Sequence, residues 1–309
     1  MMNLIQLRPT KLNDFQGKQQ LKNNIKIYLK NCLKNNSCLD HCLLYGPAGV
    51  GKTTLAKIIA NELKTNIKIV LGPQIKEKTD LLNILYSVKE NDIIFIDEIH
   101  SVNQCCYELL YSVMEDFTFS VSIGKDFNAK LTTLKLPKFT IIGATTKLGN
   151  LPDPFEERFG ILLNIDEYSS QDIYKILKFS VNHFNIDIDD EILIEIANKS
   201  KGIPRLSKRI LSRFLDHYQV KKESKEIILK KIGIYEYGLN DLDIRYLNLL
   251  KTNKAIGLKT ISQILNLDEK TIVNKIEPYL LKKNLILKTS LGRVLTIYGE
   301  TYLESNYAI

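Results

Sequence analysis

Residues 46–53 form a glycine-rich sequence of a kind that binds phosphate groups. They read Gly-Pro-Ala-Gly-Val-Gly-Lys-Thr and match the pattern GxxxxGK(S/T). In such a loop the backbone N–H groups face the phosphates, the lysine reaches the β and γ oxygens, and the last hydroxyl binds Mg²⁺. The pattern predicts a site for ATP and Mg²⁺. The residues expected to contact the nucleotide are Gly49, Gly51, Lys52, Thr53 and Thr54.

Two adjacent carboxylates follow an apolar run further along the chain. Asp97 and Glu98 come directly after Ile93–Ile96. At the end of a buried strand, Asp97 can hold Mg²⁺ through water, and Glu98 can orient the attacking water. Alone, the pair could be no more than a solvated strand end. With the phosphate-binding loop upstream, it predicts hydrolysis of ATP as well as binding.

Thr146, Arg158 and Arg205 are candidates for residues that act on the γ-phosphate. Thr146 lies just after an apolar run whose end should reach the ligand crevice of a parallel sheet. Arg158 could be an arginine finger, a device that accelerates phosphoryl transfer by about 10³ to 10⁵. The alternative for Arg158 is a surface ion pair with one of the two glutamates that precede it. If the finger serves a neighbouring subunit, a ring is required.

The sequence from residue 41 to 165 alternates short β-branched runs with longer amphipathic stretches. This pattern is typical of an α/β fold in which a parallel P-loop sheet has helices on both faces. One segment, 120–136, has the alternation of a protruding β-hairpin instead. The five predicted strands are His41–Tyr45, Ile67–Val70, Ile93–Ile96, Phe139–Gly143 and Ile161–Ile165.

Two smaller domains are predicted after this sheet. Residues 1–167 would form the large ATPase domain, 168–238 a small all-helical lid, and 239–309 a winged-helix domain. In the lid, Ser169 or Ser170 can cap one helix, Asp189 or Asp190 can begin the next, and Gly202 can end it. The winged helix is predicted from helices near Leu242–Lys251, Leu258–Leu265 and Glu269–Leu281, and from strands Leu285–Lys288 and Val294–Ile297.

Composition limits the class of protein. Hydrophobic residues make up 44% of the 309 residues and charged residues 25%, values that are usual for globular chains. No apolar stretch or leader indicates a membrane span or a secretion signal, so a cytoplasmic location without membrane contact is expected. The five cysteines lack a repeated CxxC pair, so neither a disulfide framework nor a zinc ribbon is indicated. The net charge of +8 is compatible with phosphate contacts but is weak evidence by itself.

Several short motifs resemble those of one family. The chain resembles the RuvB family, AAA+ ATPases that drive branch migration of Holliday junctions, nearly from end to end. The resemblance rests on Leu7-Arg8-Pro9, Leu43-Leu44-Tyr45-Gly46-Pro47, Phe95-Ile96-Asp97-Glu98-Ile99-His100, Met114-Glu115-Asp116-Phe117, Gly143-Ala144-Thr145-Thr146, Arg158-Phe159-Gly160 and Glu277-Pro278-Tyr279-Leu280.

This resemblance implies a set of roles. The family forms a hexameric ring around double-stranded DNA at Holliday junctions, meets its partner RuvA through the hairpin 120–136, and is linked indirectly to a RuvC-like resolvase where one is present. Arg158 would be a finger acting in trans, and Arg205 a sensor in the lid. Lys288 and Arg293 would contact DNA. The residues implied to help enclose the nucleotide are Leu7, Arg8, Glu115, Asp116, Phe117 and Tyr168.

The sequence also departs from the family pattern. Lys288 occupies a position that is usually arginine, so it keeps the charge for a phosphate contact but lacks the guanidinium fork. Ser101 and Lys147 are further departures, and the wing turn Ser290-Leu291-Gly292 is less basic than usual. These differences affect expected DNA affinity more than ATP hydrolysis. His100 could tune the site, but a structural histidine is the more common outcome.

Three other functions share parts of this pattern. A clamp-loader ATPase would have the same nucleotide site, but it usually shows a Ser-Arg-Cys finger, whereas this chain has Glu157-Arg158-Phe159. A sequence-specific, ATP-switched DNA protein would need base-reading side chains, which are few in Asp268–Leu281. A scaffold that does not hydrolyse ATP would not need Asp97, Glu98 and Arg158 together. Turnover measurements discriminate this last class.

Overall fold

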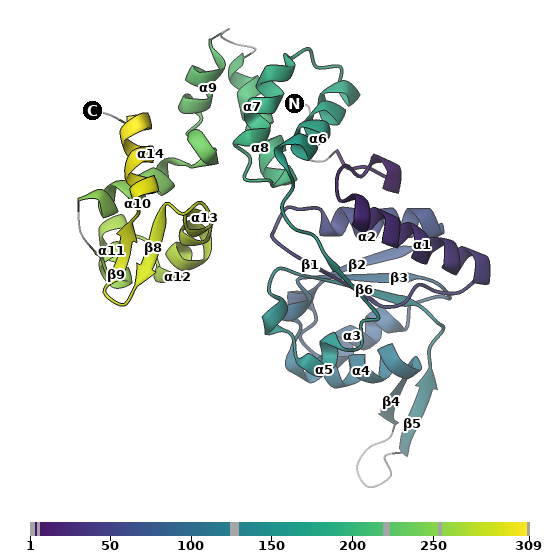
Figure 1. The fold of residues 1–309 in the computed structure, drawn as a ribbon. Helices are drawn as coiled ribbons and strands as arrows, with labels where there is room; N and C mark the ends of the chain where they lie inside the picture. Colours follow the sequence, from purple (N-terminus) through teal and green to yellow (C-terminus); the bar gives the residue numbers. More distant parts are fainter. Residues whose placement is uncertain (1–3, 5–6, 124–129, 219–222, 253–254, 308–309) are drawn as a thin grey trace. The chain divides into compact units, whose positions relative to one another are not determined.

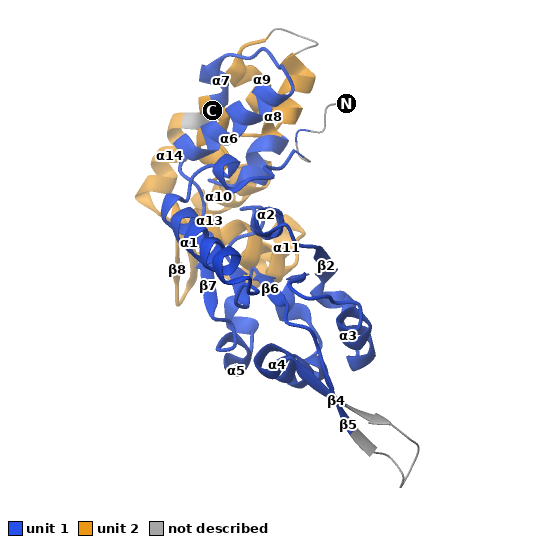
Figure 2. Ribbon diagram, turned by 90° about the vertical axis from the view of Figure 1, so that its right-hand side faces the viewer, with its two compact units in different colours: residues 1–193, 202–209 blue, residues 194–201, 210–309 orange. Residues whose placement is uncertain are grey.

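The computed structural model describes residue 4 and residues 7–123, 130–218, 223–252 and 255–307. The described residues fall into two compact units, which Figure 2 colours separately. Unit 1 comprises residues 1–193 and 202–209, and unit 2 comprises residues 194–201 and 210–309. This division follows contacts in space and separates parts of helices α7 and α8. The three domains with boundaries after residues 167 and 238 stay a prediction.

A five-stranded parallel sheet forms the centre of the described part of unit 1, with strand order β2-β3-β6-β1-β7. The three central strands, β3, β6 and β1, are nearly continuous buried apolar runs, as parallel strands covered on both faces require, whereas the edge strands β2 and β7 are partly exposed. The five predicted strands are confirmed, with small differences at their ends. The observed bounds are β1 Cys42–Tyr45, β2 Ile67–Leu71, β3 Ile93–Asp97, β6 Thr140–Thr145 and β7 Ile161–Asn164.

Helices cover both faces of this sheet (Figure 1). On one face lie α1 (Gln19–Asn35) and α2 (Lys52–Leu63). On the other lie α3 (Lys78–Leu85), α4 (Tyr107–Asp116) and α5 (Asp153–Glu156). Fully buried side chains join the second layer to the strands, among them Leu81, Ile94, Ile96, Leu110 and Val113. Burial of each of these side chains contributes about 1.5 to 3 kcal/mol to stability. This packing holds the strands, and therefore their ends, in fixed positions.

A two-stranded hairpin projects from the end of α4 (Figure 1). It consists of β4 (Thr118–Ile123) and β5 (Lys130–Lys135), paired antiparallel. The predicted hairpin at 120–136 is confirmed, although Gly124 and Lys125 lie outside the described residues. Phe119 is buried at its base and meets the ring of Tyr86 edge-on, with centroids 5.6 Å apart. This contact anchors the hairpin to the layer of α3 and α4.

The predicted helices of the lid are present. Helix α6 spans Ser170–His183, and its N-cap Ser169 accepts a hydrogen bond from the N–H of Asp172 at 3.1 Å. Helix α7 spans Asp190–Asn198, and Gly202 follows it with a φ of +69°. Helix α8 spans Pro204–Tyr218, with proline at its first position, where no N–H is needed. Helix α9 spans Lys225–Lys231.

The C-terminal part of unit 2 is a winged helix, with two corrections to the predicted elements. Helices α10 (Asp241–Lys251) and α11 (Leu258–Leu265) match, and the wing strands are β8 (Ile286–Thr289) and β9 (Gly292–Leu295). The single helix predicted from Glu269 is instead α12 (Glu269–Thr271), a π-helical turn (Ile272–Ile276) and α13 (Glu277–Lys282). Pro278 explains the interruption because it has no N–H for an α-helical bond.

The second correction concerns the C-terminus. Ile297 was predicted at the end of a strand, but it begins helix α14 (Ile297–Tyr307). Thr296 starts this helix, because its hydroxyl accepts a hydrogen bond from the N–H of Gly299 at 3.0 Å. The helix could not be predicted from the sequence because its first turn lacks an amphipathic pattern. Its apolar residues Ile297 and Tyr298 are 79% and 72% exposed.

Membrane spans, disulfides and metal sites were each considered from composition, and the described residues give the following findings. None of the described helices is both long and apolar enough to cross a membrane. All five cysteines are described and carry free thiols. In the described part of the chain, no group of three or more His, Cys, Asp or Glu side chains has the arrangement of a metal site.

Candidate nucleotide-hydrolysis site

The loop between β1 and α2 has a backbone that only glycine can adopt easily. Gly46 and Gly51 have φ values of +143° and +108°, which side chains disfavour. A Cβ on Gly46 would lie 2.2 Å from the carbonyl oxygen of Ile165. The turn therefore delivers the chain into α2 at Lys52, where the free N–H groups of the helix N-terminus form an anion-binding end.

Lys52 lies inside this loop. Its Nζ donates hydrogen bonds to the carbonyl oxygens of Gly46 (2.8 Å) and Pro47 (3.0 Å). Burial lowers the pKa of Lys52, although the charges of Glu98 and Asp97 act in the opposite direction. Lys52 is 6% exposed, and a buried ammonium group gains much from a phosphate anion.

Thr53 and Asp97 meet across the site. The hydroxyl of Thr53 donates to a carboxylate oxygen of Asp97 at 3.1 Å, although the two residues lie on different elements. A hydroxyl and a carboxylate are hard oxygen ligands of the kind that Mg²⁺ prefers. The residues present therefore fit a bound Mg²⁺, which would replace their mutual hydrogen bond.

Glu98 is held in an unusual position. Its φ of +51° lies in the left-handed region, and its N–H donates to Asp97 Oδ1 at 3.1 Å. Its Oε2 accepts a hydrogen bond from the hydroxyl of Thr146 at 3.1 Å. Thr146 follows β6, which lies next to β3 in the sheet. The predicted catalytic carboxylate and the predicted γ-phosphate sensor thus lie in contact.

His100 also belongs to this network. Its Nδ1 lies 2.9 Å from the hydroxyl of Thr145 and 3.3 Å from Glu98 Oε2. Burial lowers the pKa of His100 below its ordinary value, Glu98 opposes this, and Lys147 and Lys52 add to the lowering. A neutral imidazole with these partners is better suited to hold Glu98 and Thr145 in place than to transfer protons directly.

These residues open into one cavity of about 540 Å³. Among the predicted contacts, it brings together the phosphate-binding loop, both carboxylates, Thr146, and four residues that sequence spacing did not connect: Leu7, Arg8, Tyr168 and Arg205. Tyr168 donates a hydrogen bond to the carbonyl of Val50 at 3.1 Å, and the N–H of Arg205 donates to the carbonyl of Gly49 at 3.3 Å. Tyr168 at the start of the predicted lid and Arg205 on α8 are thus both held against the loop.

Sequence reasoning missed part of this cavity. Lys208 lies one turn after Arg205 on α8, and its Nζ donates to the carbonyl of Leu7 at 2.6 Å. Burial, followed by the charge of Arg8, lowers the pKa of Lys208 to about 8. The helical spacing of Arg205 and Lys208 was a signal that could have identified it. The other missed lining residues are Pro9, Phe15, Gln16, Ala48, Val50, Ile176 and Pro204.

Arg158 lies elsewhere in unit 1. Its guanidinium is 3.3 Å from Glu115 and lies 4.5 Å from the ring centroid of Tyr111. Within the described residues, its Nε is buried without a hydrogen-bond partner. The expected alternative, an ion pair with Glu156 or Glu157, is replaced by this pair with Glu115. Arg158 thus remains a candidate finger with one unsatisfied donor.

The structure does not place Arg158 in the cavity of its own chain. Among described residues, the lining of that cavity also omits Glu115, Asp116 and Phe117. Asp116 ends α4 and Phe117 follows it with a φ of +53°.

Lys288 and Arg293, the predicted DNA contacts, face each other across the wing. They are paired residues of β8 and β9. Both bind Glu277, with Lys288 Nζ at 2.6 Å and Arg293 Nε at 2.8 Å from its carboxylate. The two cations are therefore brought together, but part of their charge is neutralised.

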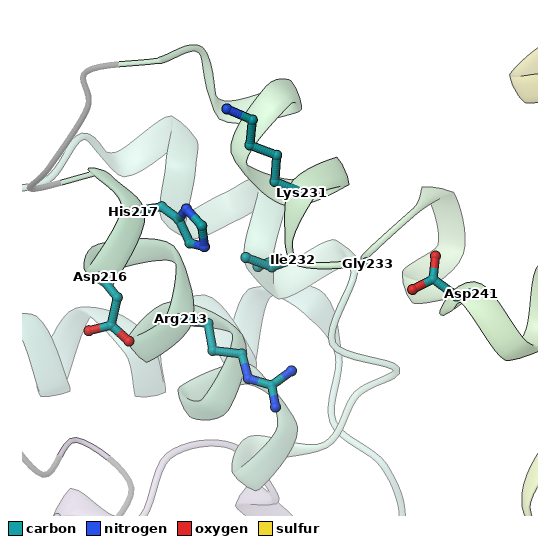
Figure 3. Close-up of a pocket in the computed structure, with 7 residues that line it drawn as sticks. All are labelled: Arg213, Asp216, His217, Lys231, Ile232, Gly233 and Asp241. Carbon is teal, nitrogen blue, oxygen red and sulfur yellow. The ribbon is translucent and has the colours of Figure 1, made fainter.

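A second cavity, of about 390 Å³, lies within unit 2 (Figure 3). Figure 3 shows Arg213, Asp216 and His217 from α8, with Lys231 at the end of α9 and Asp241 at the start of α10. Lys231 is already paired with Glu223 at 2.6 Å, and Asp241 accepts a hydrogen bond from Tyr235 at 2.6 Å. The mixed and partly satisfied charges give this cavity no catalytic set comparable to that of unit 1.

Three family models together match nearly the whole chain. The model described as the Holliday junction DNA helicase RuvB P-loop domain matches residues 7–165. The RuvB AAA lid domain matches residues 168–244, and the RuvB C-terminal winged helix domain matches residues 236–304. The second and third matches overlap at the junction of the lid and the winged helix.

Individual relatives agree with these matches. The Holliday junction branch migration complex subunit RuvB of Ureaplasma parvum serovar 3 is 48% identical over 306 residues, which are 98% of each chain. The corresponding subunit of Mycoplasma genitalium is 43% identical and is covered to 97%. A solved structure of the Thermotoga maritima RuvB Holliday junction branch migration motor has a TM-score of 0.82 and 33% identity, and 99% of it is covered by 98% of this chain.

Proposed function

The chain belongs to the RuvB family, and from this premise we propose that it is an ATP-driven motor of Holliday junction branch migration. It hydrolyses ATP and uses the free energy to translocate double-stranded DNA during recombination and repair. The observation that carries the proposal is the convergence of Lys52, Thr53, Asp97, Glu98 and Thr146 on one cavity. Binding alone would not need Glu98 in contact with Thr146.

The residues of the cavity have separate tasks in hydrolysis. Lys52 binds the β- and γ-phosphate oxygens with its ammonium, and Thr53 with Asp97 holds Mg²⁺. Mg²⁺, when bound, neutralises charge that develops on the phosphates. Glu98 accepts a proton from the attacking water and orients it, while Thr146 senses the γ-phosphate. Leu7, Arg8 and Tyr168 enclose the nucleotide, and Arg205 contacts it from the lid.

The position of Arg158 supports a ring. Glu115 and Asp116 end α4, Phe117 follows them, and Arg158 comes just after α5. None of the four lines the cavity of its own chain, so a role at a nucleotide would lie at the site of a neighbouring subunit. We therefore propose a hexamer in which Arg158 is the finger for the adjacent site. Its buried, unpaired Nε is compatible with an arginine that rearranges when the neighbour binds ATP.

The partners follow from family membership and from the hairpin. The relatives are named as subunits of a Holliday junction branch migration complex. We propose that β4 and β5 bind RuvA, that Lys288 and Arg293 belong to the DNA-binding surface, and that a RuvC-like resolvase acts in the same process where present. A cytoplasmic location without membrane contact fits this role. The three-domain division at 167 and 238 is retained as part of the proposal.

Junction-dependent ATP turnover tests the function. ATP hydrolysis is measured with Mg²⁺ and RuvA, in the absence and presence of a synthetic four-way junction. We expect the junction with RuvA to raise turnover, since hydrolysis is coupled to engaged DNA. The matched control is the same protein with Asp97→Asn, which removes the Mg²⁺ ligand charge and should abolish turnover in both conditions. ATP turnover that is the same with and without DNA and RuvA would contradict the motor function and favour an ATPase of another class.

A further inference from the structure

Glu277 is a charged residue in the core of the winged helix. It is 0% exposed and is the first residue of α13, directly after the π-helical turn. A buried carboxylate is costly unless it is paired and hydrogen-bonded. The role of this carboxylate must therefore be sought in its partners.

The partners of Glu277 come from three different elements. Tyr246 on α10 donates a hydrogen bond to Oε1 at 3.1 Å, and Arg293 on β9 donates to the same atom from Nε at 2.8 Å. Lys288 on β8 lies 2.6 Å from Oε2. Burial by itself raises the pKa of Glu277, but the hydrogen bonds from Arg293 and Lys288 outweigh it and leave the pKa below its ordinary value. The carboxylate is thus ionised and joins the wing to the helices.

The two opposed cations of the wing need a nearby carboxylate to offset their repulsion. Lys288 and Arg293 are directly opposite each other in the antiparallel register of β8 and β9. Like charges at opposed positions destabilise a strand pair. A carboxylate between the two side chains offsets this repulsion and fixes both cations in one arrangement. The backbone of Arg293 is also held, by paired hydrogen bonds with Ile256.

The two cations differ in exposure. The side chain of Lys288 is 42% exposed, whereas that of Arg293 is 17% exposed. The guanidinium of Arg293 uses Nε and one terminal nitrogen on Glu277, the latter at 3.5 Å. Lys288 uses one contact and keeps ammonium N–H groups for another acceptor. The inner arginine is arranged for support, and the outer lysine for contact with an external anion.

We propose that Glu277 is a positioning residue of the DNA-binding surface, which holds Lys288 as the outer cation that contacts a DNA phosphate and Arg293 as its inner support. The inference rests on the proposed function, because it assumes that the wing binds duplex DNA. It assigns different tasks to Lys288 and Arg293, and it gives a buried acid a part in binding a polyanion.

The direction in which Glu277→Gln changes DNA affinity distinguishes a positioning role from a simple effect of charge. Glu277→Gln keeps the side-chain shape but removes a negative charge near the DNA. Simple electrostatics then predicts tighter binding. Positioning predicts about tenfold weaker binding, since a charge-assisted phosphate contact is lost. The affinity of the full-length protein for a fluorescent duplex is measured by anisotropy over a range of salt concentrations, with Glu269→Gln, an exposed acid of the same domain, as the control.

Three further measurements distinguish positioning from a purely structural role. With Glu277→Gln, the slope of log affinity against log salt should fall by about one, as for loss of one phosphate contact. In a Lys288→Ala background the same substitution should have little further effect, because Glu277 acts through Lys288. Arg293→Lys keeps the charge but loses the two-nitrogen contact, so it should weaken binding several-fold with an unchanged slope.

Each outcome decides the inference. Weaker binding by Glu277→Gln, without weakening by Glu269→Gln, supports it. Binding as tight as wild type or tighter, with a cooperative unfolding transition retained, overturns it. If Glu277→Gln does not fold, Arg293→Lys decides: weaker binding supports the inference, and unchanged binding overturns it. Wild-type protein that fails to bind duplex at low salt overturns the proposed function and, with it, this inference.

Discussion

At the scale of residues, the site is built from short contacts between side chains that are distant in sequence. Thr53 donates a hydrogen bond to Asp97, and Thr146 donates one to Glu98, so the pair proposed to bind Mg²⁺ and the pair proposed for hydrolysis are adjacent. Asp97 and Glu98 are neighbours in the chain, yet the left-handed backbone of Glu98 directs them to different partners. Such local strain persists where the surrounding fold stabilises it, and it is common at functional sites.

Substitutions of Glu98 and Lys52 should impair different steps. Glu98→Gln keeps the hydrogen bond from Thr146 but cannot accept a proton, so ATP binding should persist while turnover falls by about 10² to 10⁴. Lys52→Ala removes the buried ammonium and should weaken ATP binding itself. Equilibrium binding of a fluorescent ATP analogue and steady-state phosphate release measure the two effects. Normal turnover by Glu98→Gln would show that the catalytic assignment is wrong.

Lys208 should make nucleotide affinity depend on pH. Its pKa is lowered to about 8, so below that pH the ammonium is charged before ATP binds. The bound phosphate charge favours the ammonium form, so at higher pH binding must take up a proton. Affinity should therefore fall above pH 8, by at most about tenfold for each pH unit. Titration of ATP binding between pH 7 and 9.5 measures this.

Lys208→Met is the control for that pH dependence. The variant cannot take up the proton, so its affinity should be lower at pH 7 and should change less between pH 8 and 9.5. An identical pH profile in wild type and variant would assign the dependence to another group.

At the scale of elements, parallel strands and one helix N-terminus create the cavity. β1 leads into the glycine-rich loop, β3 into the two carboxylates and β6 into Thr146, the proposed sensor, all at the carboxyl ends of the strands. Apolar strand runs and glycine spacing made this part predictable from sequence. The contacts of Lys208 with Leu7 and of Tyr168 with Val50 were not predictable from spacing, because they join segments that are more than a hundred residues apart.

The winged helix was also only partly predictable from sequence. Period and turn residues predicted α10, α11 and the wing, but the π-helical turn before Pro278 and the helix α14 were missed. The hydrogen-bond pattern of a π-turn leaves no mark on hydrophobic spacing. The burial of Glu277 among two cations is likewise a property of the packed domain. A glutamate beside a proline in sequence gives no signal that it lies at 0% exposure.

The position of Arg158, the proposed finger, after α5 gives a prediction for mixed rings. Arg158→Ala should lose most ATP turnover although its own cavity is intact, because the finger that it lacks serves a neighbour. Lys52→Ala keeps its finger but cannot bind ATP well. Mixing the two inactive proteins should therefore restore part of the turnover. Phosphate release by the mixture, compared with each protein alone, measures this.

Assembly must be checked in the same samples. Native mass spectrometry of differently tagged chains shows whether mixed rings form. Mixed rings without any recovered turnover would contradict a role for Arg158 in trans, and high turnover by Arg158→Ala alone would remove it from catalysis.

At the scale of the whole molecule, family membership covers the ATPase, lid and winged-helix parts of one chain. A motor needs all of them: a site that releases free energy, a lid that responds to nucleotide, and a surface that holds DNA through phosphate contacts. One of the expected departures from the family pattern, Lys288 in place of an arginine, lies in the proposed DNA-binding surface. Sequence-independent contacts of this type should weaken steeply with salt, while ATP binding in the enclosed cavity should depend on it less.

Branch migration itself tests the central claim most directly. The full-length protein is incubated with RuvA, ATP, Mg²⁺ and a labelled synthetic four-way junction with homologous arms, and products are separated by native electrophoresis. Lys52→Ala and a sample without ATP are the controls. We predict ATP-dependent conversion of the junction to duplex products by wild-type protein alone among these samples. ATP turnover without any conversion of the junction, with binding to RuvA and DNA verified, would contradict the motor function.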